Sequence, residues 1–419
     1  MPEPHRLLTG PRRIAPADQA AVRRGNLGLV LRLLRDAGPR SRARIAQETG
    51  LNKATVSSLV AELADRGLVS TGEVDRAGAV GRPGLTVHLD GAGVCGIGVE
   101  LNVDYVAVLA LDLRGEVRFE RRVALDVPAL GAERTLDEVA RLVAEALVAV
   151  PDAVPVGLTV AVPGLVRSGD GVVTDAPNLG WRDVPVLAGL AARLDPGCPV
   201  RAENDANLSA IAEWARGPEA RTPDLVYLTG EVGVGGGLVV DGRLLRGAAG
   251  FSGEVGHTPL GDPAVVCGCG RRGCWETVVG LGALLRAAAD PGDPVRDAGR
   301  DLESRLAELA ARADAGDRRT LDALAAVGAG LGAGAAVLIN LVNPQVVLLG
   351  GYFAVLGRFL LEPMTAVLRD RVLAADLGGA RVVLSTLGFT AAVRGGAHVA
   401  LEQVFDDPTL VPAPDLPQH

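Results

Sequence analysis

The chain has 419 residues, 48% of them hydrophobic, which is enough for the cores of two or three domains. Its formal net charge of −8 argues against nucleic-acid binding by the chain as a whole, but the charge is unevenly distributed. Residues 1–90 contain 14 Lys and Arg against 9 Asp and Glu, whereas the remainder contains 28 against 41, so only the N-terminal part is suited to meet DNA.

The start of the chain carries no targeting signal that we can identify. Its first residues, MPEPHRLLTGPRR, lack the apolar region of a signal peptide, and no apolar run of 18 residues is free of charged, Gly or Pro residues. We therefore expect a cytoplasmic protein that makes no contact with a membrane. Residues 1–22 are rich in Pro and Arg and are predicted to be flexible.

Residues 23–90 are predicted to form a winged helix-turn-helix. Apolar residues at helical spacing predict helices over 26–36, 42–49 and 54–66, and Gly residues follow the last two. Alternating residues at 68–70 and 85–89 predict two short strands joined by a loop that contains Gly and Arg. The order helix, helix, turn, helix and two-stranded wing is typical of DNA-binding domains.

The start of the third helix is the segment that we expect in the major groove of DNA. Lys53, the only lysine of the chain, precedes hydroxyl side chains that are short enough to reach phosphates or base edges. The wing carries arginines suited to the minor groove. The predicted DNA contacts are Lys53, Thr55, Ser57, Ser58, Arg76 and Arg82. The alternative is a protein-docking or dimerisation module with the same helices.

Residues 93–405 change to an α/β pattern, and residues 406–419 are predicted to be a disordered tail. Strands are predicted over 94–100, 105–111, 156–162, 225–229, 237–240, 346–349 and 382–385. Helices are predicted over 133–150, 207–216, 281–288, 302–313, 318–341 and 391–404.

Three closely spaced cysteines and a histidine form the most specific motif. His257, Cys267, Cys269 and Cys274 offer one imidazole and three thiolates, the ligand set of a tetrahedral structural zinc site. We expect one Zn²⁺ per chain, and we expect the glycines at 268, 270 and 273 to let the cysteines converge. The alternative is a set of reduced free cysteines near a histidine. Cys95 and Cys198 are expected to be buried thiols.

With this cluster the sequence resembles the ROK family, which groups repressors, uncharacterised reading frames and sugar kinases. The resemblance runs over most of residues 23–405 and rests on PNLGW (177–181), ENDAN (203–207), GVGGGLVVDGRLLRGAAGFSGEVGH (233–257), CGCGRRGCWE (267–276) and NPQVVLLGG (343–351). It implies an actin-like, hexokinase-type fold with two lobes, about 93–205 and 206–390, a C-terminal helix 391–405 that returns to the first lobe, and a sugar between the lobes.

The expected sugar site uses side chains that can hydrogen-bond to several hydroxyl groups at once. Its predicted members are Asn178, Asn204, Asp205, Glu254, His257 and Glu276. The resemblance implies that Asp205 matches the catalytic base of the kinases and that His257 both binds zinc and contacts sugar. The alternative for ENDAN is the capped start of a helix.

Two turns depart from the kinases of the family. Residues 98–104 read GVELNVD where the kinases have a phosphate-binding turn with paired glycines, and residues 229–233 carry Glu231 where the kinases keep a small polar residue. Leu101 and Val103 are bulky and Glu100 is anionic, so we expect no ATP binding and no enzymatic activity. Asp205 is then expected to bind sugar without acting as a base.

These features predict a transcriptional repressor that binds operator DNA and responds to a sugar or sugar phosphate, as a homodimer or dimer of dimers. Two alternatives stay open: an ATP-dependent sugar kinase with an accessory DNA-binding domain, and a regulator controlled by a partner protein.

Overall fold

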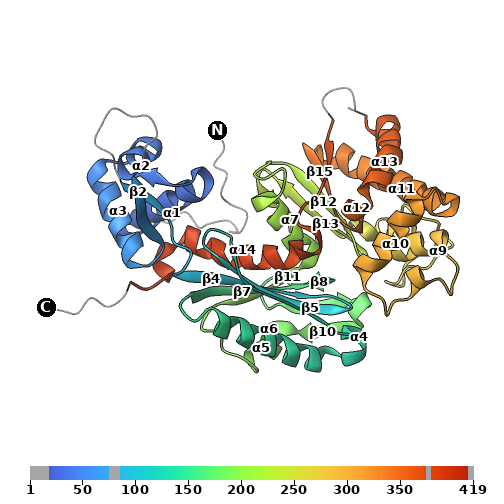
Figure 1. Ribbon diagram of the computed structural model, residues 1–419, viewed down its shortest axis with the longest axis horizontal. Coiled ribbons are helices and arrows are strands. Elements are labelled where there is room, and N and C mark those ends of the chain that lie inside the picture. The colour runs from blue at the N-terminus through green and yellow to red at the C-terminus, as the bar shows by residue number, and fades with distance from the viewer. Residues whose placement is uncertain (1–17, 75–84, 374–378, 414–419) are drawn as a thin grey trace.

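The computed structural model describes residues 18–74, 85–373 and 379–413. Its N-terminal part, which we call the head, packs three helices against a small antiparallel sheet of order β1-β3-β2 (Figure 1). Its elements are α1 (Gln19–Ala37), β1 (Arg40–Ser41), α2 (Arg42–Thr49), α3 (Lys53–Asp65), β2 (Val69–Val74) and β3 (Leu85–Leu89). The predicted helices and strands of the winged helix-turn-helix are therefore present.

Helix α1 begins earlier than the sequence pattern suggests. The Asp18 side chain accepts a hydrogen bond from the Ala21 backbone N–H at 2.6 Å and caps the helix. Residues 19–22, which we assigned to a flexible segment, are therefore helical, although the apolar Val22 among them is exposed. The wing residues Arg76 and Arg82 lie outside the described residues.

A five-stranded sheet follows the head, with the order β11-β7-β4-β5-β6. Its strands are β4 (Val94–Leu101), β5 (Tyr105–Asp112), β6 (Val117–Ala124), β7 (Val154–Val162) and β11 (Val200–Asn204). Strands β4, β7 and β11 run parallel, and β5 and β6 extend the sheet in antiparallel fashion. Helices α4 (Val127–Leu130), α5 (Ala132–Ala149) and α6 (Val186–Ala191) and a small sheet of β8 (Leu165–Val166), β9 (Val172–Ala176) and β10 (Trp181–Pro185) complete this first lobe.

A second five-stranded sheet repeats this plan, with the order β14-β13-β12-β15-β16. Its strands are β12 (Leu225–Gly230), β13 (Val234–Val240), β14 (Arg243–Leu244), β15 (Val346–Gly351) and β16 (Arg381–Leu384). Strand β12 pairs antiparallel with β13 and parallel with β15, as β4 does with β5 and β7. The β4–β5 and β12–β13 turns therefore occupy equivalent places in the two sheets. This pair of mixed sheets is the expected two-lobed α/β architecture.

The helices of the second lobe are α7 (Asp205–Arg216), α8 (Glu276–Val279), α9 (Leu281–Ala288), α10 (Leu302–Asp314), α11 (Arg318–Val342), α12 (Tyr352–Val355) and α13 (Gly357–Arg371). Helix α13 was not predicted; it contains Pro363, although its buried residues Leu360, Met364 and Leu368 recur at helical spacing. Pro363 and the Leu360 carbonyl lie so close to Gly328 of α11 that a Cβ there would be within 2.7 Å of both.

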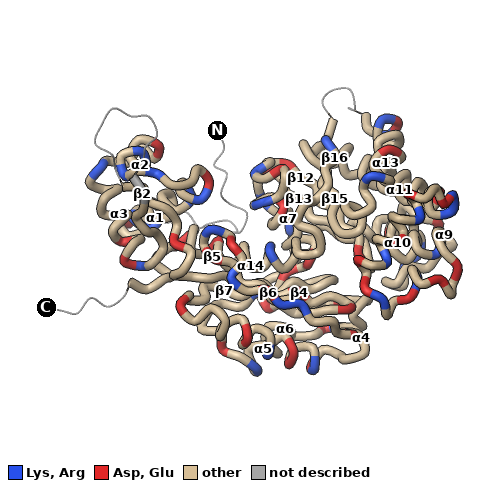
Figure 2. Tube along the Cα trace, in the orientation of Figure 1, with Lys and Arg blue, Asp and Glu red and all other residues tan. Residues whose placement is uncertain are grey.

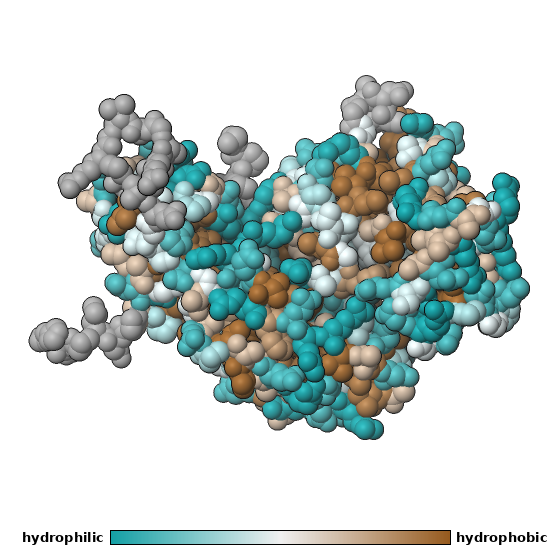
Figure 3. Space-filling model, in the orientation of Figure 1, coloured by the Kyte–Doolittle hydropathy of each residue, from teal (hydrophilic) through white to brown (hydrophobic). Residues whose placement is uncertain are grey.

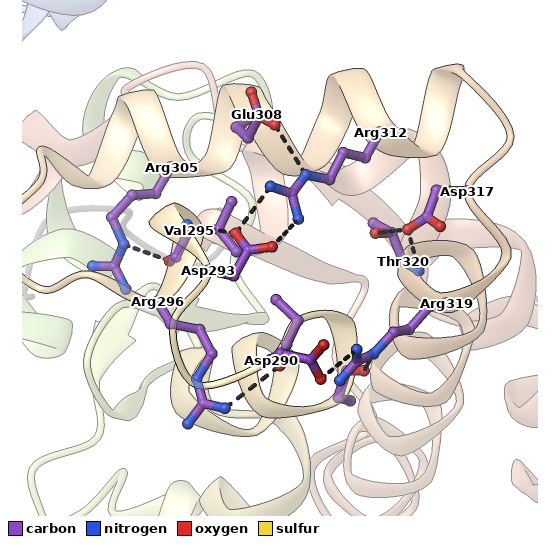
Figure 4. Close-up of polar contacts among 12 residues, drawn as sticks. Asp290, Asp293, Val295, Arg296, Arg305, Glu308, Arg312, Asp317, Arg319 and Thr320 are labelled. Carbon is purple, nitrogen blue, oxygen red and sulfur yellow. Dashed lines mark hydrogen bonds and ion pairs between the residues drawn. The ribbon is translucent and has the colours of Figure 1, made fainter.

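Among the described residues, α11 is the helix whose length and apolar composition would suit a membrane span. It packs between α9 and α13, and its buried side chains belong to the core of the second lobe. The outer surface beside it is mainly polar at the right-hand edge of Figure 3. Arg312 bonds Asp293 at 2.7 and 2.9 Å, and Arg319 bonds Asp290 at 2.8 Å (Figure 4). Helix α11 is thus a helix of the core of the second lobe, and ion pairs lie at the surface beside it.

Helix α14 (Ala391–Asp406) joins all parts of the molecule (Figure 1). It covers the face of the first sheet opposite α5 and packs against α7 of the second lobe. These approaches require glycine: a Cβ at Gly98 would lie 1.9 Å from the Val393 carbonyl oxygen, and one at Gly395 would lie 1.9 Å from the Leu208 carbonyl oxygen. The lobes therefore meet through α7 and α14.

Part of the C-terminal tail is ordered, which corrects our expectation for residues 406–419. A short 3₁₀ helix, Pro408–Leu410, follows α14, and Val411 is buried in the core that α14 shares with the head. The Val411 carbonyl also accepts a hydrogen bond from Arg66 at 2.5 Å. The Pro- and Asp-rich composition gave no sign of this order, because the buried residues Pro408 and Val411 find their partners only in the folded protein. Residues 414–419 lie outside the described residues.

Candidate functional site

A cleft between the two lobes brings together all six side chains that we predicted as sugar contacts: Asn178, Asn204, Asp205, Glu254, His257 and Glu276. The first lobe and the start of α7 supply one wall, and the β12–β13 turn and the segment from Gly253 to Glu276 supply the other. The sequence separates these groups by up to 98 residues, so only the fold places them in one pocket. Sugar binding by these side chains stays a prediction.

The start of α7 explains the roles of Asn204 and Asp205. The Asn204 side chain caps α7 by accepting from Asn207 N–H at 3.0 Å, and its Nδ2 donates to the Gly164 carbonyl at 3.1 Å. Asn204 is thus the helix cap that we considered as the alternative, although it also lines the cleft. Burial raises the pKa of Asp205 to about 6, although a hydrogen bond from Ala206 N–H at 2.8 Å opposes the rise.

Glu254 and Glu276 lie on the opposite wall and differ in their partners. Glu276 Oε2 accepts from Val234 N–H at 3.0 Å, which fixes its carboxylate beside the β12–β13 turn. Glu254 has its Oε2 4.0 Å from His257 Nε2, and burial together with the charges of Asp205 and Glu276 raises its pKa to about 7. The wall therefore offers one rigidly held carboxylate and one that is available to a ligand.

His257 and the three cysteines meet at the edge of this wall, with their potential ligand atoms all within 4.8 Å of one another. Cys269 Sγ lies 3.8 Å from Cys274 Sγ, and His257 Nδ1 lies 3.8 Å from Cys267 Sγ. A tetrahedron with Zn–S bonds of about 2.3 Å has edges of about 3.8 Å, so these residues fit a zinc ion. Three thiolates and a neutral imidazole would leave the Zn²⁺ site with net negative charge. Four protein ligands would leave no open coordination position for a substrate on a zinc ion bound here.

The turn that carries the cysteines is a tight knuckle. Gly270 N–H donates to the Cys267 carbonyl at 2.9 Å, and Cys267 N–H donates to the Arg271 carbonyl at 2.8 Å. Gly270 and Gly273 have φ values of +82° and +70°, a region that favours glycine. Gly268 has neither a positive φ nor a neighbour within 4 Å of a built Cβ, so our expectation that it is needed for convergence is wrong.

The two equivalent sheet turns meet at the other end of the cleft. Asn102, from the β4–β5 turn, donates through Nδ2 to Glu231 Oε2 of the β12–β13 turn at 2.6 Å. Both residues line the cleft, whereas Leu101 is fully buried in the first lobe. Our expectation that Leu101 obstructs this space is therefore incorrect, and Asn102 is the lining residue that we missed. A polar residue at the end of an apolar strand was the available signal.

Glu100 lies behind this contact. Its Oε1 accepts from the Tyr105 hydroxyl at 2.5 Å, and it is 2% exposed. Burial is the main cause that raises the pKa of Glu100 to about 7, and the neighbouring carboxylates add to the rise. Burial and the charge of Glu100 likewise raise the pKa of Glu231 well above its ordinary value. Two carboxyl groups thus lie at this meeting point of the turns, Glu231 in the lining of the cleft and Glu100 behind it.

The predicted recognition helix α3 presents one polar face. Val56, Leu59, Val60 and Leu63 are buried in the head, whereas Lys53, Ser57 and Ser58 are exposed. Asn52 caps the helix by accepting from Thr55 N–H at 2.8 Å, and Thr55 is half-buried. Ser58 Oγ accepts from Arg23 of α1 at 3.2 Å, so it faces α1. Lys53 and Ser57 remain the best placed of the predicted DNA contacts.

The head is fixed to α14 by a shared core and by ion pairs. Leu27, Leu31 and Phe405 belong to one buried cluster that also includes side chains of the first sheet. Arg35 of α1 bonds Glu402 of α14 at 2.8 Å and lies over the Phe405 ring at 4.5 Å. Arg32 of α1 bonds Asp406 at 2.6 Å, and Asp36 pairs with Arg221 of the second lobe at 3.3 Å. Charged positions of both signs lie along α1 and α14 (Figure 2).

Comparison with known proteins agrees with this architecture. A model of the ROK family matches residues 96–403, and a model of the MarR family matches residues 28–78. The xylose repressor of Caldicellulosiruptor bescii is 31% identical over 391 residues, which cover 91% of this chain and 96% of that protein.

Two crystal structures, one of a regulator and one of an enzyme, match different shares of this chain. A ROK family transcriptional regulator, a homolog of the E. coli MLC protein, superposes with a TM-score of 0.73 and 27% identity over 93% of this chain and 98% of its own. The ROK family glucokinase of Streptomyces griseus, in complex with glucose and AMPPNP, has a TM-score of 0.63 and 27% identity, and covers 73% of this chain and 98% of its own. The chain therefore belongs to the ROK family, as a transcriptional regulator with a MarR-type winged helix-turn-helix at its N-terminus.

Proposed function

We propose that this chain is a sugar-responsive repressor that binds operator DNA through its head and a sugar in the interlobe cleft, without phosphorylating that sugar. One observation carries the proposal: the six polar side chains of the predicted sugar site converge in one cleft, which Glu231 also lines and behind which Glu100 is buried. Carboxylates and amides suit sugar hydroxyls, whereas two carboxyl groups oppose a polyphosphate.

The proposed organisation has a DNA-binding domain over residues 23–90 and a two-lobed effector domain over residues 93–405. Zinc, bound by His257 and the three cysteines, would hold one wall of the cleft, because His257 belongs to both the metal cluster and the cleft lining. Lys53, Thr55, Ser57 and Ser58 are the proposed DNA contacts of α3, and Arg76 and Arg82 those of the wing. We place the protein in the cytoplasm, as a homodimer or a dimer of dimers on a pseudo-palindromic operator.

A continuous set of contacts could couple sugar and DNA. Asp205, in the cleft, is the first residue of α7, α7 packs directly on α14, and the far end of α14 is bonded to α1 of the head. A movement between the lobes would therefore change where α14 holds the head. Because such coupling is a linkage, sugar and DNA must change each other's affinity by the same factor.

Xylose is the first sugar to test, because relatives of this chain are xylose repressors. The experiment measures the affinity of the purified protein for DNA from its own upstream region, with and without D-xylose, D-glucose and other monosaccharides. We expect one sugar to weaken operator binding by about 5- to 150-fold, the usual range of allosteric coupling. Sugar binding that leaves operator affinity unchanged would refute the switch.

The sugar-kinase alternative has its own test. ATP turnover over the same sugars, abolished by Asp205→Asn, would replace our proposal with an enzyme that carries a DNA-binding domain. The partner-protein alternative would be favoured if no sugar of the panel binds the cleft.

A further inference from the structure

We propose that the effector carries no phosphate or other anionic group, and that Glu231, held in place by Asn102, is the residue that enforces this choice. The inference rests on the proposed function of the cleft as the effector site and narrows its ligand to an uncharged sugar. Three features of the cleft support it: the charges of its lining, the hydrogen bonds that several of its backbone amides already make within the protein, and the position of Glu231.

The charge of the lining is the first feature. Among the described residues that line the cleft there is no Lys or Arg, whereas four are acidic: Asp205, Glu231, Glu254 and Glu276. Arg122 is the guanidinium beside this region, and it is engaged elsewhere, since it covers the Tyr105 ring at 3.8 Å and pairs with Glu303 at 3.3 Å. A phosphate dianion would enter this cleft without a counter-charge, at a cost that the low effective dielectric enlarges.

Backbone amides are the second source of phosphate binding in proteins, and four amides of the two turns that line the cleft already donate to groups of the protein itself. In the β4–β5 turn, Val103 N–H donates to Asn102 Oδ1 at 2.7 Å, and Asn102 N–H donates to the Tyr105 carbonyl at 2.9 Å. In the equivalent β12–β13 turn, Glu231 N–H donates to the Gly233 carbonyl at 3.0 Å, and Val234 N–H donates to Glu276 at 3.0 Å.

The N-terminus of α7 is also poorly suited to bind a phosphate. Its first N–H groups are the ones that could receive an anion, and they donate instead to side chains of the protein itself. Ala206 N–H donates to Asp205 Oδ1 at 2.8 Å, and Asn207 N–H donates to Asn204 Oδ1 at 3.0 Å. A phosphate would have to displace a carboxylate that is already bound to this helix terminus.

Glu231 is the third feature, because its carboxylate is held across the cleft. Asn102 Nδ2 bonds Glu231 Oε2 at 2.6 Å and also lies 3.1 Å from the Tyr105 hydroxyl, which in turn donates to Glu100. Glu100 Oε2 is buried and has no hydrogen-bond partner among the described residues. Burial raises the pKa of both glutamates, and the charge of Glu100 adds to the rise at Glu231, so negative charge is already poorly stabilised beside this contact.

An uncharged sugar is not repelled by these carboxylates and does not need free backbone amides. Its hydroxyl groups can donate to the carboxylates of Asp205 and Glu254, and such bonds to charged acceptors are stronger than neutral ones. The same groups that exclude a phosphate therefore favour a polyol. Carboxylates that have no cationic partner in the lining reject an anion by repulsion, so the specificity does not depend on added contacts.

The test compares D-xylose and D-glucose with glucose 6-phosphate and inorganic phosphate, by isothermal titration calorimetry on the full-length zinc-loaded protein. The wild type should bind at least one neutral sugar, and should bind glucose 6-phosphate at least about tenfold more weakly than glucose. Glu231→Gln should lower the ratio of the glucose affinity to the glucose 6-phosphate affinity by about tenfold or more. It should change the affinity for the neutral sugar by less than about threefold.

Glu138→Gln is the matched control, because Glu138 lies on α5, where its partner is the exposed Arg141. It should leave the ratio of affinities unchanged. Circular dichroism checks the fold of each variant, and Glu231→Ser provides a second neutral replacement if Glu231→Gln does not fold. Equal affinity of the wild type for glucose and glucose 6-phosphate, or a ratio unaltered by both variants, would overturn the inference while leaving sugar sensing intact. Binding of neither class of compound would overturn the proposed function as well.

Discussion

Replacing Arg35 by Met should loosen the head from the body. The Arg35 side chain is 3% exposed and bonds both Glu402 and Asp36 at 2.8 Å, and its guanidinium covers the Phe405 ring. Burial lowers the pKa of Arg35, but the carboxylates of Glu402 and Asp36 outweigh this effect and raise it. Arg35→Met keeps most of the apolar stem and removes the charge, so the change removes the ion pairs together with the guanidinium contact to Phe405.

The expected cost follows from the burial of the remaining partner. Glu402 is 11% exposed, and His398, 3.7 Å away, offers no replacement charge because burial lowers its pKa well below its ordinary value. Breaking a buried pair by removing one member costs about 3–5 kcal/mol. Arg44→Met is the control, because the Arg44–Glu48 pair lies on the surface of the same head, where such pairs contribute about 0–1 kcal/mol.

Hydrogen–deuterium exchange measures this loosening directly. Amides of α14 near residues 401–405 and of α1 near residues 31–35 should exchange at least about 100-fold faster in Arg35→Met, since each 1.4 kcal/mol changes an opening equilibrium about tenfold. The double variant Arg35→Met/Glu402→Met should recover part of the loss, because no unpaired charge remains. If exchange in α14 changes no more in Arg35→Met than in Arg44→Met, the junction does not hold the head and our account of coupling fails.

Three further predictions concern other parts of the molecule. Cys269→Ser should lose zinc and sugar binding together, and a metal content that stays near that of the wild type would contradict the four-ligand assignment. Glu213 is buried in α7, accepts a hydrogen bond from Ser385 and has a pKa that burial raises to about 7, from 4.5 when unfolded. The protonated Glu213 side chain contributes its full stabilisation below pH 4.5, and about 3 kcal/mol of the free energy of unfolding is lost as the pH rises to about 7. In Glu213→Gln, the free energy of unfolding measured by urea denaturation should therefore depend less on pH over that range. Lys53→Met should weaken operator binding and lower the slope of log affinity against log salt by about 1, whereas Arg141→Met on the body should not; an unchanged slope for Lys53→Met would remove this residue from the DNA contacts.

Local sequence patterns were sufficient to predict much of the structure of this protein. The 3.6-residue period of Val56, Leu59, Val60 and Leu63 predicts α3, because a helix must bury one face against the rest of the head. The spacing of the cysteines likewise predicts the zinc cluster, since residues so close in the chain can converge through a short turn. Both features depend on contacts between residues near one another in sequence.

Some elements were missed because their local signals are weak or contradictory. Strand β6 is an exposed edge strand with alternating charged residues, and helix α13 contains a proline. Pairing with β5 orders β6, and packing against α11 maintains α13 in spite of Pro363. Tertiary contacts therefore override local propensity in both elements.

The sequence by itself determined which chemical groups are available: the zinc ligands, the polar residues of the cleft and the two carboxyl-bearing turns. Only the tertiary structure decided how they are used. Asn102 bonds Glu231, 129 positions away, because equivalent turns of two similar sheets face one cleft. Asn204 caps α7, and α14 shares its core with a head more than 300 residues earlier in the chain. These outcomes depend on which faces of the sheets and helices pack together, and no local pattern encodes that choice.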